Sequence, residues 1–229
     1  LQWPHLSARL QGAVRHRQKV IHEAMHRLAV LSLVLSVLSL EAAKPPLLQQ
    51  FVIKKPTPQW FGERIKLPPG FAPKMKLRGI EEILFAPGMF KDTEKDFFSY
   101  VFLFALGPKP ELTADVLRGE LLTYYSGLSK NVMRNPKLDT SKFTVKLESL
   151  KENGSTPKGA VDVKSYRAQV YWLEPFATKK MQTLHFELQA WKYKGSPYNY
   201  LFVCASPQRV EAPIWKTMRG IRASIAIKD

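Results

Sequence analysis

Three long runs with the pattern of β-strands follow one another in the second half of the chain, at about residues 161–174, 180–194 and 198–205. Apolar and polar residues alternate along the middle run, so one face would carry Leu184, Phe186, Leu188 and Ala190. Successive side chains of a strand point to opposite faces, and such alternation is typical of a half-buried strand. Turn residues at 194–197 separate the last two runs, and we expect the strands to be antiparallel.

Shorter strand-like segments precede these runs, at residues 63–67, 80–86 and 143–147. Residues 97–106 (FFSYVFLFAL) are apolar at nearly every position. A strand that is apolar on both faces has no side that suits water, so this segment predicts a central strand covered on both sides.

Two segments have the periodicity of α-helices. Apolar residues recur at helical spacing through residues 113–131, where Thr113 is suited to the N-cap. A second helix is expected near residues 212–224, with Pro213 in its first turn. Together with the strands, these helices predict an α+β fold, an antiparallel sheet with packed helices in the manner of an α-β-α sandwich.

An uncharged apolar run at residues 28–40 follows a short basic head that starts at Met25. Basic, then apolar, then small residues is the order found in secretory signal peptides, and we assign the signal peptide to residues 25–42. A run of 13 residues is too short to span about 30 Å of hydrocarbon as a helix. The alternative is a buried hydrophobic helix.

The assignment divides the rest of the chain. We interpret residues 1–24 as translated upstream sequence or a mis-called start, and residues 43–60, which are rich in proline, as an extended tether. Residues 61–229 are then expected to form a single domain. The predicted location is exported, either periplasmic or extracellular.

The domain that remains is basic. Hydrophobic residues make up 45% of the chain and charged residues 24%, which is the composition of a globular protein. Residues 43–229 hold 30 Lys and Arg against 17 Asp and Glu, a formal net charge of +13. For an exported protein this charge favours anionic lipid, a wall polymer or a protein partner, and makes nucleic acid an unlikely partner. A basic surface with no dedicated partner is the alternative.

The basic residues form three clusters in the sequence: Lys74, Lys76 and Arg78; Lys179 and Lys180; and Lys216, Arg219 and Arg222. Aromatic residues adjoin these clusters only loosely, so the pattern of single-strand nucleic-acid binders is absent. We interpret the clusters as solvated surface.

Few residues could support catalysis or metal binding. Residues 43–229 contain one histidine, His185, and one cysteine, Cys204. These numbers exclude multi-histidine zinc sites and Cys/His clusters, and we predict no metal, no cofactor and no catalytic residue. Cys204 lies in an apolar strand-like run and is expected to be buried and inert. A small secreted hydrolase would need His185 or two of the carboxylates Glu81, Glu82, Glu174 and Glu187.

The strongest candidate for a binding site is a polar strand face. Arg167, Gln169 and Tyr171 share one face of their strand, and His185, Glu187 and Trp191 share one face of the next. If these two strands pair, both sets line the same side of the sheet. Large polar and aromatic groups on a sheet face can bind a ligand or a partner, although an ordinary solvent-facing side has the same pattern.

Residues 65–71 (IKLPPGF) are similar to the strand, proline and aromatic opening of PsbP-like domains. The order of elements that follows, with a helix, long strands and a closing helix, extends the resemblance over about residues 60–229. It implies an α-β-α layout and an exported extrinsic or accessory protein without enzymatic activity. We therefore expect an exported binding or accessory protein that is not an enzyme.

Overall fold

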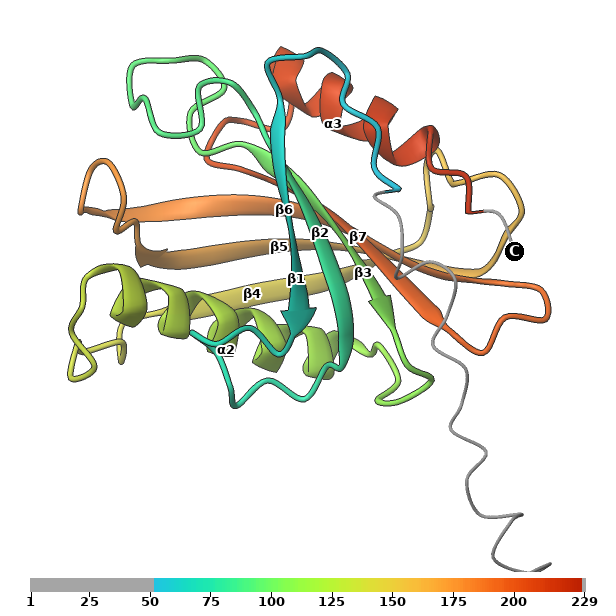
Figure 1. Ribbon diagram of the computed structural model, residues 1–229, viewed down its shortest axis with the longest axis horizontal. Helices are drawn as coiled ribbons and strands as arrows, with labels where there is room; N and C mark the ends of the chain where they lie inside the picture. The colour runs from blue at the N-terminus through green and yellow to red at the C-terminus, as the bar shows by residue number, and fades with distance from the viewer. Residues whose placement is uncertain (1–51, 228–229) are drawn as a thin grey trace, which may run out of the picture. The chain divides into compact units, whose positions relative to one another are not determined.

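A seven-stranded antiparallel sheet is the centre of the computed structural model, which describes residues 52–227 (Figure 1). The strands are β1 (Phe61–Leu67), β2 (Gly79–Phe85), β3 (Tyr100–Leu106), β4 (Thr144–Leu150), β5 (Ala160–Leu173), β6 (Met181–Tyr193) and β7 (Asn199–Ser206). Their order across the sheet is β1-β2-β3-β7-β6-β5-β4, and each neighbouring pair is antiparallel. The sheet therefore consists of two meanders, β1–β3 and β4–β7, which meet where β3 pairs with β7.

The strands predicted from sequence are confirmed. The three long runs form β5, β6 and β7, which pair in succession as expected. The run at residues 97–106 contains β3, which lies between β2 and β7 and is buried over almost its whole length. Its apolar residues on both faces are explained by this central position, because each face is covered by a separate layer.

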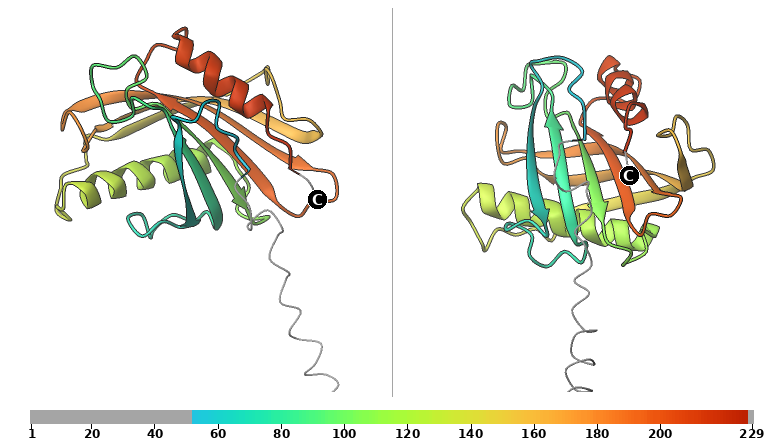
Figure 2. Two further views of the ribbon diagram at one scale, coloured as in Figure 1. Left: turned by 45° about the horizontal axis from the view of Figure 1, so that its top comes forward. Right: turned by 45° about the vertical axis from the view of Figure 1, so that its right-hand side comes forward.

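The two predicted helices are also confirmed, as α2 (Ala114–Val132) and α3 (Pro213–Ala223). The Thr113 side chain caps α2 by accepting a hydrogen bond from the backbone N–H of Val116 at 3.3 Å. Asp115 lies in the first turn of α2 and Lys130 in its last turn, and both charges are favourable to the helix dipole. The helices lie on opposite faces of the sheet (Figure 2).

Each face of the sheet carries its own hydrophobic core. On the α2 side the core is strongly aromatic and includes Phe98, Tyr100, Phe102, Tyr124, Tyr125, Trp172 and Phe186. On the α3 side it is built from Trp60, Trp191, Tyr200, Phe202, Cys204, Trp215 and Met218. The sheet is thus covered on both sides at its centre, which explains why β3 and β7 have no solvent-facing side.

The predicted α-β-α sandwich, however, is wrong, because it assigns too large a share of the fold to helices. Strands make up 36% of the described residues and helices only 17%, so the fold is dominated by its sheet. Only two segments within residues 52–227 are helical, and each covers part of one face: α2 packs on β4 and β5, and α3 on β7. Loops cover much of the rest. Ala72, Met75 and Leu77 contribute to the core on the α2 side, and Ile53 and Trp60 to the core on the α3 side.

The assignments made for the N-terminus fall largely outside the described residues. The predicted signal peptide, residues 25–42, and the segment before it are among them. The described part of the predicted tether packs on the sheet, because the backbone N–H groups of Val52 and Ile53 donate to the Glu82 carboxylate at 2.7 and 3.2 Å. Within residues 52–227, neither helix has the length and apolar character needed to cross a membrane.

Cys204 is fully buried in β7, as predicted. Burial raises the pKa of its thiol to about 12, because the thiolate would lose its hydration. The thiol is therefore protonated at neutral pH and unreactive in the folded protein.

Candidate functional site

A groove of about 500 Å³ opens on the α3 side of the sheet, between α3, the loop that joins β4 to β5, and the strands β5 and β6. Six charged residues line it: Lys151, Glu152, Arg167, Glu187, Arg219 and Arg222. We call it the arginine groove. Its four basic and two acidic side chains give it a net positive charge, and it brings together residues from four separate parts of the chain.

Glu187 is the central anion of the arginine groove. Its carboxylate accepts two short hydrogen bonds from Arg219, 2.6 Å from Nη2 to Oε1 and 3.1 Å from Nε to Oε2. This is the planar, two-point geometry that suits a guanidinium and a carboxylate. The contact raises the pKa of Arg219, whose guanidinium also lies 5.9 Å from the centre of the Trp215 ring. Arg219 is thus held in place by the protein itself.

Arg222 is in a different position. Its side chain is only 7% exposed, and its Nη1 lies 3.6 Å from Glu187 Oε2, a long ion pair. Its Nε is buried without a hydrogen-bond partner among the described residues. A buried guanidinium normally has its donors satisfied, because leaving a charged donor unpaired away from water is costly. Arg222 therefore lines the arginine groove as a guanidinium that the described residues satisfy only in part.

The wall of the groove opposite α3 is fixed to the sheet. Gln189 Nε2 donates to the backbone carbonyl of Asn153 at 2.7 Å and to Ser165 Oγ at 3.3 Å. Asn153 Nδ2 in turn donates to the carbonyl of Val163 at 3.3 Å. These bonds tie the β4–β5 loop to β5 and β6, so the groove is formed before any ligand arrives.

The predicted polar strand face is formed, but it is divided. Register pairs Arg167 with Glu187 and Gln169 with His185, so all four lie on one side of the sheet. Arg167 and Glu187 line the arginine groove. Gln169, Tyr171 and His185 lie further along the same face, outside the groove.

Trp191 shares this face but is buried in the core under α3, where it stacks on Tyr200 with ring centres 5.8 Å apart.

The sequence did not indicate that Arg219 and Arg222 belong to a site. Their spacing of three residues on a predicted helix put them on one helical face, but only the packing of α3 on the sheet brings that face to Glu187. The interpretation of Arg222 as solvated surface is wrong, because it is buried.

The four carboxylates considered for acid–base chemistry do not form a pair. Glu81 and Glu82 are consecutive in β2 and belong to opposite faces of the sheet. Glu174 accepts hydrogen bonds from three backbone N–H groups of the loop that follows it, those of residues 176–178. Glu187 is engaged by Arg219. Glu82 accepts hydrogen bonds from the backbone N–H groups of residues 52 and 53. Glu82, Glu174 and Glu187 thus have structural roles.

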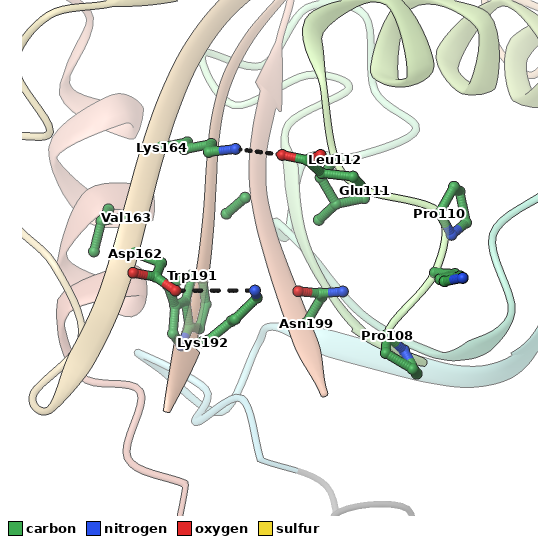
Figure 3. Close-up of a pocket in the computed structure, with 12 residues that line it drawn as sticks. Pro108, Pro110, Glu111, Leu112, Asp162, Val163, Lys164, Trp191, Lys192 and Asn199 are labelled. Carbon is green, nitrogen blue, oxygen red and sulfur yellow. Dashed lines mark hydrogen bonds and ion pairs between the residues drawn. The ribbon is translucent and has the colours of Figure 1, made fainter. Parts of the chain in front are cut away.

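A larger cavity, of about 710 Å³, lies where β5 begins and β6 ends (Figure 3). Its charged residues include two ion pairs, Lys164 with Glu111 at 2.8 Å and Lys192 with Asp162 at 3.9 Å. All four side chains are at least half exposed, so water already solvates them. Exposed, mutually neutralised pairs offer little to a ligand compared with a buried guanidinium. For this reason we place the candidate site in the arginine groove.

His185 is expected to have no essential role. It is half-buried on the sheet face opposite Gln169, and burial lowers its pKa, which keeps the ring neutral at pH 7. Replacing His185 by Ala should change the free energy of unfolding by no more than about 0.5 kcal/mol, as for an ordinary surface substitution. Urea unfolding of both proteins measures this change. A loss of several kcal/mol, or the loss of a hydrolytic activity with the fold intact, would instead give the ring a structural or catalytic role.

Comparison with known proteins identifies no relative. No protein-family model matches the chain, and neither a curated protein nor a solved structure similar to it was found. The resemblance to PsbP-like domains is therefore neither supported nor contradicted by these comparisons. The function has to be argued from the arginine groove itself.

Proposed function

We propose that the protein is an exported, non-enzymatic binding or accessory protein, and that the arginine groove holds an anionic group of its ligand. One observation carries this proposal: the buried side chain of Arg222, with an unpartnered Nε, lines an open groove. Support for export comes from the uncharged run at residues 28–40.

The chemistry of the arginine groove favours a carboxylate or phosphate group. Guanidinium groups bind both through paired N–H donors, and such charge-assisted bonds are about twice as strong as neutral ones. Glu187 neutralises Arg219, which leaves Arg222 and the half-exposed Arg167 with capacity for a second anion. Because Arg167 is paired with Glu148 only at 3.7 Å, it can reorient towards a ligand at little cost.

The test uses two simple probes, inorganic phosphate and citrate, titrated into the full chain by calorimetry. We expect saturable binding of at least one of them. Arg222→Met should weaken it by about tenfold or more, because a charge-assisted bond to a buried donor is worth at least about 1.4 kcal/mol. Arg167→Gln, at a half-exposed position that cannot disturb the core, should weaken it severalfold.

Arg118→Gln is the matched control. Arg118 is also an arginine of a helix with an acidic partner, but it lies in α2 on the other side of the sheet. This variant should bind like the unaltered protein. Binding that survives both Arg167→Gln and Arg222→Met would place the anion elsewhere. If neither phosphate nor citrate binds, the proposal is wrong.

A further inference from the structure

Three phenylalanine side chains from distant parts of the sequence meet on the surface. Phe61 of β1, Phe90 of the β2–β3 loop and Phe176 of the β5–β6 loop are 38%, 50% and 37% exposed. The ring centres of Phe61 and Phe90 are 6.2 Å apart, and those of Phe90 and Phe176 are 5.5 Å apart. We call this cluster the phenylalanine patch. Single exposed apolar residues are common on proteins, but a contiguous aromatic cluster usually marks an interaction site.

The patch rests on the aromatic core of the α2 side. Phe61 packs on Phe85 with ring centres 5.0 Å apart, and Phe176 packs on the buried Phe98 at 5.9 Å. The exposed rings are therefore the outer layer of a continuous aromatic stack. They could not turn inward, because the space beneath them is already filled.

The loops that carry the patch are held in one conformation. The buried Glu174 carboxylate accepts hydrogen bonds from the backbone N–H groups of Phe176 at 2.5 Å and Thr178 at 2.6 Å. In the other loop, Asp96 accepts from the N–H of Gly88 at 3.1 Å, and the N–H of Phe98 donates to the carbonyl of Met89 at 3.1 Å. Because both loops are already ordered, docking the patch loses little conformational entropy.

Charge favours one class of partner. The exposed Lys179 and Lys180 follow Phe176 in the same loop, whose only acid, Glu174, is buried and satisfied by backbone donors. In the other loop the exposed Lys91 and Lys95 are balanced by the exposed Asp92 and Glu94, and the third acid, the half-buried Asp96, is bound by the N–H of Gly88. Exposed aromatic rings beside uncompensated lysines are the combination that binds the interface of an anionic bilayer, where rings enter the headgroup region and lysines meet lipid phosphates.

We propose that the phenylalanine patch docks the protein on an anionic lipid bilayer. The inference does not depend on the arginine groove, which lies under α3 and uses other residues. It gives a location to the membrane association that the net charge of +13 on residues 43–229 favours. The rings supply burial of apolar surface, and Lys179 and Lys180 supply attraction to the lipid phosphates.

The first experiment places a fluorescent reporter in the patch of the full chain. An environment-sensitive dye is attached through Phe176→Cys, and the native thiol does not compete because Cys204 is fully buried. On vesicles of phosphatidylcholine with phosphatidylglycerol, the emission should shift to the blue as the dye enters the interface. The same dye at Val161→Cys, an exposed apolar position at the start of β5, is the control and should not shift.

The second experiment measures co-sedimentation with the same vesicles. Replacing both Phe90 and Phe176 by Ser should reduce binding by about tenfold or more, and replacing Lys179 and Lys180 by Gln should reduce it severalfold and weaken its dependence on salt. Leu122→Ser, at an exposed apolar position of α2, should bind like the unaltered protein.

Two outcomes would overturn the proposal. The first is a dye at position 176 that does not shift on anionic vesicles, or that shifts no more than the dye at position 161. The second is a lipid-free dimer, detected by light scattering, that the Phe90 and Phe176 substitutions dissociate, since the patch would then be an interface between two copies. The reporter reads the patch directly, so neither outcome depends on what residues 1–51 do.

Discussion

Replacing Glu81 by Gln should make the protein markedly less sensitive to rising pH. Glu81 is fully buried on the α2 side of the sheet, where the Tyr124 hydroxyl donates to Oε1 at 3.1 Å. Its Oε2 has no hydrogen-bond partner among the described residues. Burial therefore raises the pKa of the Glu81 carboxyl from 4.5 to about 8, and the nearby charge of Glu63 adds to the shift.

The sign of the effect follows from proton linkage. Below pH 4.5 the carboxyl is protonated in both states, so it does not favour unfolding. Between pH 4.5 and about 8 the unfolded chain releases this proton while the folded protein keeps it, and the free energy of unfolding falls as the pH rises. Above about 8 the loss is complete. Each unit of pKa difference corresponds to about 1.4 kcal/mol, so the loss is on the order of 5 kcal/mol.

Urea unfolding at a series of pH values measures this loss. The difference in unfolding free energy between Glu81→Gln and the unaltered protein should grow in favour of the variant across that window, by on the order of 5 kcal/mol. Glu148→Gln, at an exposed carboxylate of β4, should keep the pH dependence of the unaltered protein. Parallel curves for Glu81→Gln and the unaltered protein would mean that Glu81 is ionised in the fold.

Replacing Trp172 by Ala should destabilise the fold by about 3–5 kcal/mol, as for other large aromatic side chains removed from a core. Trp172 is fully buried in β5 and packs on Phe98 and Tyr125, with ring centres 5.5 and 4.8 Å away. Its loss would leave a cavity between α2 and the sheet that these rigid rings cannot fill.

The neighbouring residue supplies the control for this substitution. Tyr171 precedes Trp172 in β5 and is exposed on the opposite face. Tyr171→Ala should therefore cost no more than about 1 kcal/mol. Urea unfolding of the two variants at one pH compares them directly. Equal losses of unfolding free energy would contradict this, because they would mean that the Tyr171 face of β5 is packed as tightly as the Trp172 face.

Local patterns predicted most of the strands and both described helices. Alternation in residues 180–194 placed the Phe186 and His185 faces correctly, because a period of two is imposed by the strand backbone itself. The share of helix in the fold was predicted too high. The sequence has strong helical periodicity in only two segments of the described chain, and the loops that complete both cores, such as residues 68–78, carry no periodic signal.

The candidate site was predicted in part. Arg167 and Glu187 could be placed on one face because strands that follow one another usually pair. The approach of Arg222 to Glu187 depends on how α3 packs, which no local pattern encodes. The same holds for Phe61, Phe90 and Phe176, which are separated by 29 and 86 residues in the sequence and meet only in the folded chain.

The pairing of β3 with β7 also has a consequence for how the protein is made. The two strands pair in register, from Tyr100 opposite Ala205 to Leu106 opposite Asn199. About a hundred residues of chain separate the two strands in the sequence. Until β7 is synthesised, β3 has an unpaired edge and two apolar faces, which is the kind of segment that aggregates. Such long-range pairing is slow, because the loop must close before the contacts form. The first meander therefore depends on the last strand for protection, and a chain interrupted before residue 199 would leave its most apolar strand open to other chains.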